Sequence, residues 1–139
     1  MEFITVEQFK VQPKEVQEVF LDWWKANISE FDLIGYIGRS EAYKECFPSL
    51  VRNVAMNCFE IGIEIIPLFT EGQLRKFIED KFRCKNIELI ANVDTCQYEI
   101  YLYRKISSLS YQRHIDGLGD NILQAYWKVS CMIAMEELA

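Results

Sequence analysis

Residues 86–105 constrain the fold more than any other part of the chain. Two runs rich in β-branched and aromatic residues, NIELIANV (Asn86–Val93) and QYEIYLYRK (Gln97–Lys105), flank a connection of only three residues. In the second run the side chains sort with a period of two, which is typical of a strand. One face carries Tyr98, Ile100 and Leu102, and the other carries Glu99, Tyr101 and Tyr103. The two runs therefore predict an antiparallel hairpin with large side chains on both faces.

Apolar residues at helical spacing predict three helices, at about residues 13–26, 71–83 and 120–137. Pro13 suits the first turn of the first helix, where its missing N–H would be unpaired anyway. Thr70 and Gln73 form a T-x-x-Q capping box in front of the second helix. The third helix is apolar around most of its circumference, so we expect it to pack on the sheet.

A further strand is predicted at 59–66, where apolar residues alternate with Glu and Gly. Together with strands at 87–93 and 97–104, it predicts an α+β fold. We expect an antiparallel sheet of three to five strands, packed with about three helices in a sandwich-like arrangement. The predicted core contains Leu74, Phe77, Ile78, Ile100, Leu102, Tyr126 and Val129.

Three segments are less regular than these. DLIGYIG (Asp32–Gly38) indicates a short strand or an extended loop. Residues 39–47 follow no clear pattern, and SLVRNVAMN (Ser49–Asn57) fits either a strand or a helix. Ser107–Gly119 is polar and has no period, which indicates a loop.

The chain has 139 residues without a linker or an internal repeat, which predicts a single domain over 1–139. Its formal net charge is −6, from 21 acidic and 15 basic residues. This balance argues against direct sequence-specific binding to nucleic acid, which depends on Lys and Arg contacts to phosphates. An acidic protein can compete with nucleic acid for a basic surface on a partner, and ordinary solubility explains the same charge.

The five cysteines and the single histidine form no recognisable metal-binding motif. None of the cysteines belongs to a C-x-x-C pair, and His114 alone cannot complete a usual zinc-finger set. The N-terminus lacks a secretory signal, and no apolar run reaches the ~18 residues of a membrane span. We therefore expect a soluble cytoplasmic protein with reduced thiols, without a metal, a cofactor or a membrane anchor.

Catalytic motifs are absent from the sequence. It contains no nucleophile elbow, Walker loop, dinucleotide fingerprint or H-E-x-x-H, so we predict a protein that is not an enzyme. Candidate binding residues gather instead at the end of the hairpin and in the next segment: Tyr101, Tyr103, Arg104, Tyr111, Arg113 and His114. Arginines beside aromatic rings can hold a phosphate and stack a base. The alternative is a solvated loop with surface ion pairs.

Trp24 is the remaining candidate for contact with a partner. It follows Trp23, which belongs to the apolar stripe of the first helix, and it points about 100° away from that stripe. An exposed Trp is a typical interface anchor. Coverage of Trp24 by residues 39–57 is the alternative. Together with the two-sided apolar hairpin, Trp24 favours a homodimer.

Two segments of the C-terminal half resemble a known group of proteins. They are IPLFTEGQLRKFIEDK (Ile66–Lys81) and, after the hairpin, DNILQAYWKVSCMIA (Asp120–Ala134). The order of proline, apolar pair, T-x-G-Q cap, amphipathic helix, sheet and A-x-W helix is similar to uncharacterised small proteins encoded by phages and prophages of Gram-positive bacteria. The resemblance implies an α/β sandwich and transfers no functional residue.

The resemblance also suggests a function. Small acidic phage proteins without catalytic motifs often act as accessory factors that blunt host defences. The leading hypothesis is a non-catalytic protein that binds and neutralises a bacterial defence component, as anti-CRISPR proteins do. The alternative is a sponge that sequesters a cyclic or ADP-ribose-type immune nucleotide. Arg104 and Arg113 would then hold its phosphates, and Tyr101, Tyr103 or Tyr111 would stack on its base.

Overall fold

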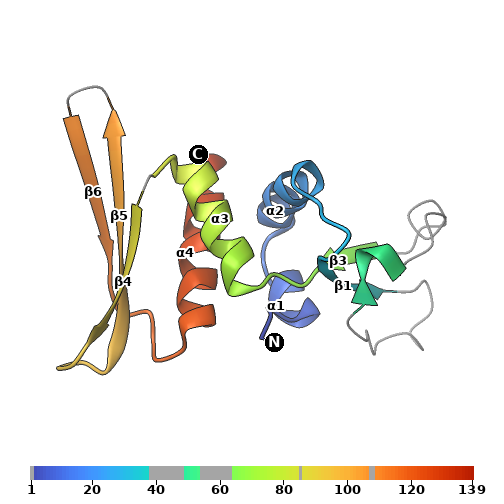
Figure 1. The fold of residues 1–139 in the computed structure, drawn as a ribbon, viewed down its shortest axis with the longest axis horizontal. Coiled ribbons are helices and arrows are strands. Elements are labelled where there is room, and N and C mark those ends of the chain that lie inside the picture. The colour runs from blue at the N-terminus through green and yellow to red at the C-terminus, as the bar shows by residue number, and fades with distance from the viewer. Residues whose placement is uncertain (1, 38–48, 54–63, 85, 107–108) are drawn as a thin grey trace. The chain divides into compact units, whose positions relative to one another are not determined.

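The computed structural model describes residues 2–37, 49–53, 64–84, 86–106 and 109–139 (Figure 1). Contacts divide the chain into two compact units, Ile4–Phe69 and Thr70–Ala139, the second of which also includes the first residues of the chain. Each unit contains one three-stranded antiparallel sheet, and the described residues form four α-helices. The predicted α+β class is therefore confirmed, with two sheets. The single domain over 1–139 remains a prediction.

The N-terminal unit combines two helices with a small sheet. Its elements are α1 (Val6–Lys10), α2 (Lys14–Ala26), β1 (Leu33–Ile37), β2 (Ser49–Leu50), the 3₁₀ helix η2 (Val51–Asn53) and β3 (Glu64–Pro67). The strand order is β2–β1–β3, and both pairings are antiparallel. Helix α1 starts at a capping box, in which Thr5 Oγ1 accepts a hydrogen bond from the N–H of Gln8.

Four aromatic side chains form the core of this unit. The buried ring of Phe69 lies 6.5 Å from that of Phe9, 5.6 Å from that of Phe20 and 6.2 Å from that of Trp23, measured between centroids. These tilted arrangements are the ones that aromatic quadrupoles favour. Phe69 lies two residues after the end of β3, whereas Phe9 belongs to α1 and Phe20 and Trp23 belong to α2. The cluster therefore joins both helices to the end of the sheet.

Three predicted elements of the N-terminal half correspond to elements among the described residues. The helix predicted at 13–26 is α2, with Pro13 at its N-cap. Asp32–Gly38 contains β1, and Ser49–Asn57 begins with β2 and η2. The strand predicted at 59–66 is observed as β3 from Glu64, whereas residues 39–48 and 54–63 lie outside the described ranges. Helix α1 is an element that the sequence analysis did not predict.

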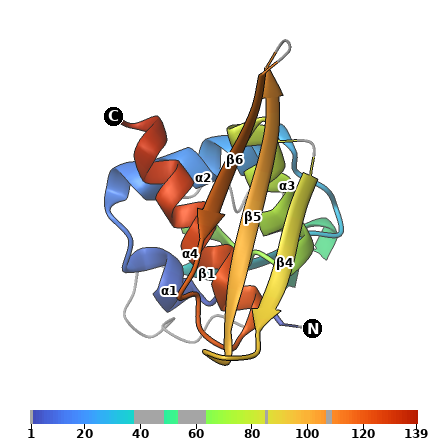
Figure 2. The ribbon, with the colours of Figure 1, turned by 90° about the vertical axis from the view of Figure 1, so that its left-hand side faces the viewer.

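The C-terminal unit is a sheet covered on one side by two helices (Figures 1 and 2). Its elements are α3 (Glu71–Phe82), β4 (Asn86–Asn92), β5 (Gln97–Ile106), β6 (Leu109–Ile115) and α4 (Ile122–Glu137). The strands are antiparallel in the order β4–β5–β6. All seven predicted core residues are buried here: Leu74, Phe77, Ile78, Ile100, Leu102, Tyr126 and Val129. Among the described helices, none is both long and apolar enough to cross a bilayer.

The loop predicted at Ser107–Gly119 is wrong over most of its length. Leu109–Ile115 forms β6, which pairs with β5 from Ile106↔Leu109 to Ile100↔Ile115. This strand has no apolar alternation because it lies at the edge of the sheet, and most of its side chains are exposed. Backbone hydrogen bonds to β5, which leave no trace in the side-chain pattern, define it as a strand.

Candidate functional site

The β5–β6 hairpin carries all the predicted site residues except Trp24, and its register divides them between two faces. Residues directly opposite one another in an antiparallel pair point to the same face, and alternate residues share it. The register pairs Tyr101 with His114, and Arg104 with Tyr111. Ile100 and Leu102 are fully buried, so their side of the sheet is the one that α3 and α4 cover (Figure 2). Arg104, Tyr111 and Arg113 share this helix-covered side, whereas Tyr101, Tyr103 and His114 lie on the other side.

Three rings stack along the side away from the helices. The Tyr101 ring is nearly parallel to the imidazole of His114, with centroids 4.3 Å apart and 8° between the planes. The Tyr103 ring lies 6.5 Å from Tyr101 at 16°. The Tyr103 hydroxyl donates to Glu88 Oε2 over 3.1 Å, and desolvation together with this bond raises the pKa of the hydroxyl. We call the surface made by Glu88, Glu99, Tyr101, Tyr103 and His114 the outer face.

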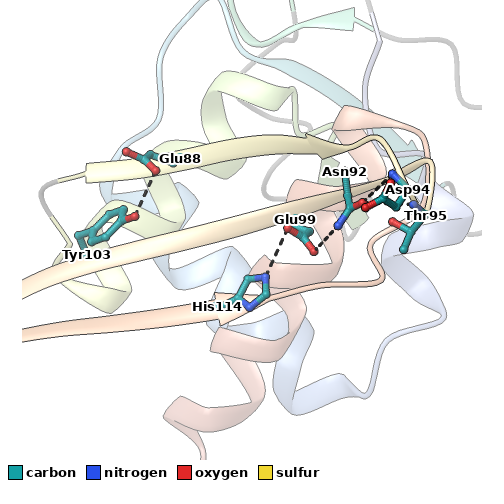
Figure 3. A network of polar contacts seen from close by, with 7 residues as sticks. All are labelled: Glu88, Asn92, Asp94, Thr95, Glu99, Tyr103 and His114. Atoms are coloured by element: carbon teal, nitrogen blue, oxygen red, sulfur yellow. Dashed lines mark hydrogen bonds and ion pairs between the residues drawn. The ribbon is translucent and has the colours of Figure 1, made fainter.

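A polar network holds Glu99 at one end of the outer face (Figure 3). Asn92 Oδ1 accepts hydrogen bonds from the backbone N–H groups of Asp94 and Thr95, which fixes the amide in the β4–β5 turn. The Asn92 Nδ2 group then donates to Glu99 Oε1 over 3.2 Å. The second oxygen, Glu99 Oε2, lies 3.6 Å from His114 Nε2. Glu99 is therefore positioned by a neighbour, and its side chain is only 16% exposed.

The helix-covered side uses its arginines in contacts within the unit. The guanidinium of Arg113 forks around the carboxylate of Glu136 on α4, with one hydrogen bond to each oxygen. That of Arg104 lies 4.9 Å from the Phe82 ring centroid and 5.5 Å from the Tyr111 ring centroid. The buried Nε of Arg104 has no hydrogen-bond partner among the described residues. Arg104 and Arg113, the two predicted phosphate ligands, thus share a face. The guanidinium of Arg113, however, is already bound to the carboxylate of Glu136.

An open hollow of about 400 Å³ lies along the hairpin. It is lined by Asn86, Tyr103, Arg104, Lys105, Ser110, Tyr111 and Gln112. Two of the lining residues are cationic and two are tyrosines, so this hollow unites the residue types that phosphate and base recognition require.

One group of side chains could hold a metal ion. Glu99, His114 and Asp116 each offer a ligand atom, and these atoms lie within 4.8 Å of one another. Asp116 directly follows the last residue of β6 and is exposed. An imidazole nitrogen with two carboxylate oxygens is a ligand set that suits divalent transition metals.

The exposure predicted for Trp24 is wrong. Its side chain is 2% exposed, and its indole Nε1 donates to Asp32 Oδ2 over 3.0 Å. The same Asp32 oxygen accepts from the backbone N–H of Ser29, so the turn after α2 supplies the partner that a buried indole needs. Trp24 belongs to the core of the N-terminal unit, and we remove it from the candidate binding surface.

Three residues that shape the site were not predicted as site residues from the sequence. Glu88 and Glu99 were interpreted only as polar positions of strands, and Asn92 only as a strand residue before a turn. The register of the β4–β5 hairpin pairs Glu88 with Tyr101, so Glu88, Asn92 and Glu99 lie on the same face as Tyr101. The register of the predicted hairpin was therefore the signal that could have identified them. Their relation to His114 depends on β6, which the sequence did not predict.

Comparison with known proteins adds no further constraint: no family model matches the chain, and no curated protein or solved structure matches it significantly. The resemblance to phage-encoded proteins therefore stays a prediction.

Proposed function

We propose that the chain is a non-catalytic binding protein that docks on a partner protein through the outer face. The observation that carries this proposal is the stacked run of Tyr103, Tyr101 and His114, rimmed by the carboxylates of Glu88 and Glu99. The two carboxylates and His114 contact the tyrosines or one another, so the surface is ordered before a partner arrives.

The physical chemistry of the outer face suits a basic partner surface. Tyrosines provide large contact areas at low entropic cost and are enriched at the centres of interfaces. Carboxylates around them attract Lys and Arg side chains, and the net charge of −6 adds long-range steering. The face lies on regular strands, which hold the side chains more rigidly than a loop would.

The phage resemblance indicates which kind of partner to test first. A host defence protein that handles nucleic acid has a basic groove, and the carboxylates of the outer face would replace phosphates there. Binding that neutralises such a protein needs no chemistry from this chain. The function that we propose is thus the inhibition of a bacterial defence component by occupation of its surface.

A pull-down from a Gram-positive host lysate, with mass spectrometry of the captured proteins, tests this proposal. Tyr101→Ala removes the centre of the stack, while Tyr111→Ala removes a tyrosine from the other side of the same hairpin. We expect the wild type and Tyr111→Ala to capture the same protein, and Tyr101→Ala to lose it. Capture should weaken steeply as salt rises. Equal capture by all three chains, or no specific partner, would refute docking through the outer face.

The open hollow favours one second candidate, capture of an immune nucleotide. Arg104 and Lys105 would hold the phosphates, and Tyr103 or Tyr111 would stack on the base. A bound nucleotide at a hundredfold excess over its dissociation constant would stabilise the fold by about 2.7 kcal/mol. Thermal melts with a panel of cyclic and ADP-ribose-type nucleotides should show this shift in the wild type and in Tyr101→Ala, but not in Arg104→Ala. If no nucleotide of the panel raises the melting temperature of the wild type, capture of an immune nucleotide is eliminated.

Self-association is the remaining proposal about partners. A second copy could dock on the outer face, since the stacked tyrosines present apolar area. Light scattering at working concentration decides this: a monomeric mass would exclude the homodimer, and a dimeric mass that Tyr101→Ala abolishes would support it.

A further inference from the structure

Three potential metal ligands converge beside the β4–β5 turn, at one end of the outer face. We propose that Glu99, His114 and Asp116 bind one divalent transition-metal ion. The site shares Glu99 and His114 with the outer face, but the inference does not require a protein partner; it departs from the sequence-based expectation of a chain without metal. The ligand atoms already lie within 4.8 Å of one another, although the three side chains come from two strands and the segment after β6.

The spacing of the ligand atoms is close to what a metal requires. Ligands about 2.1 Å from a tetrahedral zinc ion are about 3.4 Å from one another. Glu99 Oε2 and His114 Nε2 lie 3.6 Å apart, so this pair needs almost no movement. Asp116 is exposed, lies beyond the end of β6 and has its ligand atom within 4.8 Å of the other two, so the site requires only a short approach of this carboxylate.

Two of the three ligands are oriented before any ion arrives. The hydrogen bond from Asn92 Nδ2 to Glu99 Oε1 leaves Oε2 directed toward His114 (Figure 3). Stacking on Tyr101, with 8° between the rings, sets the plane of the imidazole. Neighbours that orient the ligands in this way are typical of metal centres, where they tune affinity.

The electrostatics of the cluster also favour a dication. The ligand oxygens of Glu99 and Asp116 lie within 4.8 Å of each other. Two carboxylates this close repel one another. A divalent ion between the two carboxylates would turn this repulsion into attraction. A neutral His114 would complete the set without adding charge.

The ligand chemistry selects among divalent ions. Mg²⁺ prefers oxygen ligands in a nearly octahedral arrangement and keeps much of its water, so an imidazole suits it poorly. Zn²⁺ accepts nitrogen and oxygen ligands together, and three protein ligands leave a position open to water or to a group from a partner. We therefore expect the site to bind Zn²⁺ and not to bind Mg²⁺.

Isothermal titration of the full-length protein with Zn²⁺, after removal of metals by a chelator and in a non-thiol reductant, tests the site. We expect one saturable site per chain. His114→Ala should abolish it, and Asp116→Asn should weaken it strongly. Asn92→Ala, which removes the hydrogen bond to Glu99 together with the acceptor of two N–H groups in the turn, should weaken it about tenfold or more. Asp94→Asn is the matched control, since that exposed carboxylate is adjacent but is no ligand, and it should bind as the wild type does.

Co²⁺ substitution separates this site from the cysteines. Coordination by one imidazole and two carboxylates gives visible d–d bands without a thiolate-to-metal charge-transfer band. Circular dichroism of each variant establishes that it is folded. The inference is overturned if His114→Ala and Asp116→Asn both bind Zn²⁺ like the wild type, if the charge-transfer band appears, or if no saturable binding occurs. None of these outcomes depends on finding a protein partner.

Discussion

Glu136→Gln is predicted to lower the free energy of unfolding by about 1 kcal/mol at neutral pH. The carboxylate of Glu136 receives both hydrogen bonds of the Arg113 fork, which ties β6 to α4 within the C-terminal unit. Exposed ion pairs contribute about 0.2–1 kcal/mol, and a bidentate pair belongs at the upper end of that range. The side chains are 29% and 51% exposed, so solvent screening excludes a larger value. The melting temperature should fall by roughly 4 °C.

The pH dependence of this effect has a defined sign. The hydrogen bond from Arg113 lowers the pKa of Glu136 from its ordinary value of 4.5. A carboxyl group whose pKa is lowered by folding stabilises the native state above its unfolded pKa. That contribution is lost as the pH falls through the folded pKa. The difference between the wild type and Glu136→Gln should therefore be largest at neutral pH and smaller at a pH below 4.5.

Urea denaturation at both pH values, with a double-mutant cycle that adds Arg113→Ala, measures the interaction. We expect a coupling energy of about 1 kcal/mol that falls when salt is added. A Glu136→Gln variant as stable as the wild type at neutral pH would show that Arg113 is not engaged by Glu136 in solution. Arg113 would then be available for a phosphate, as the sequence-based sponge hypothesis expects.

Three further predictions concern single residues. Thr70→Ala removes the hydrogen-bond acceptor of the α3 capping box and should cost about 1 kcal/mol in urea denaturation, and an unchanged midpoint would contradict the cap. Trp24→Phe deprives Asp32 of its indole donor and should lower stability by about 2 kcal/mol in the same assay, whereas a loss below the error would mean that the indole bond is dispensable. Burial raises the pKa of the Cys131 thiol to about 12, while Cys96 is exposed. Iodoacetamide should therefore alkylate Cys96 and spare Cys131 in the native protein; alkylation of Cys131 before denaturation, read by mass spectrometry, would contradict its burial.

The parts of the fold that sequence predicted well are those with a local physical signal. The helix after Thr70 has a capping box and an apolar stripe, and it begins where the box places it. Strand β5 has a period of two, and its buried face holds Ile100 and Leu102 as predicted. Both signals depend on neighbours within a few residues, so no tertiary contact is needed to recognise them.

The elements that sequence missed have signals that are short or non-local. Helix α1 starts at Thr5 with the same T-x-x-Q signature as α3, but five residues are too few for a helical period to show. Strand β6 lies at an exposed edge, where packing does not constrain the side chains. The burial of Trp24 depends on Asp32 in a following turn, and helical periodicity contains no information about that partner.

The candidate site was predicted in part, for the same reason. Tyr101, Tyr103 and His114 were identified by residue type, and the structure brings these three together. Tyr101 and Arg104 point to opposite faces of β5, because strand positions alternate and these two are separated by an odd number of residues. Only the register with β6 could place His114 on the ring of Tyr101.

Strand β5 links the fold to the proposed function because its two faces have separate roles. The even-numbered residues Ile100 and Leu102 are buried under the helices, whereas the odd-numbered Tyr101 and Tyr103 form the centre of the outer face. A change of register by one residue would exchange the two sets, so the packing that stabilises the unit also fixes which side chains a partner meets. The buried residues Ile100 and Leu102 therefore fix the orientation of the outer face, although they are not part of it. Substitutions at the odd positions Tyr101 and Tyr103 are therefore expected to alter the proposed docking and to spare the core, whereas substitutions at Ile100 or Leu102 would disturb the packing.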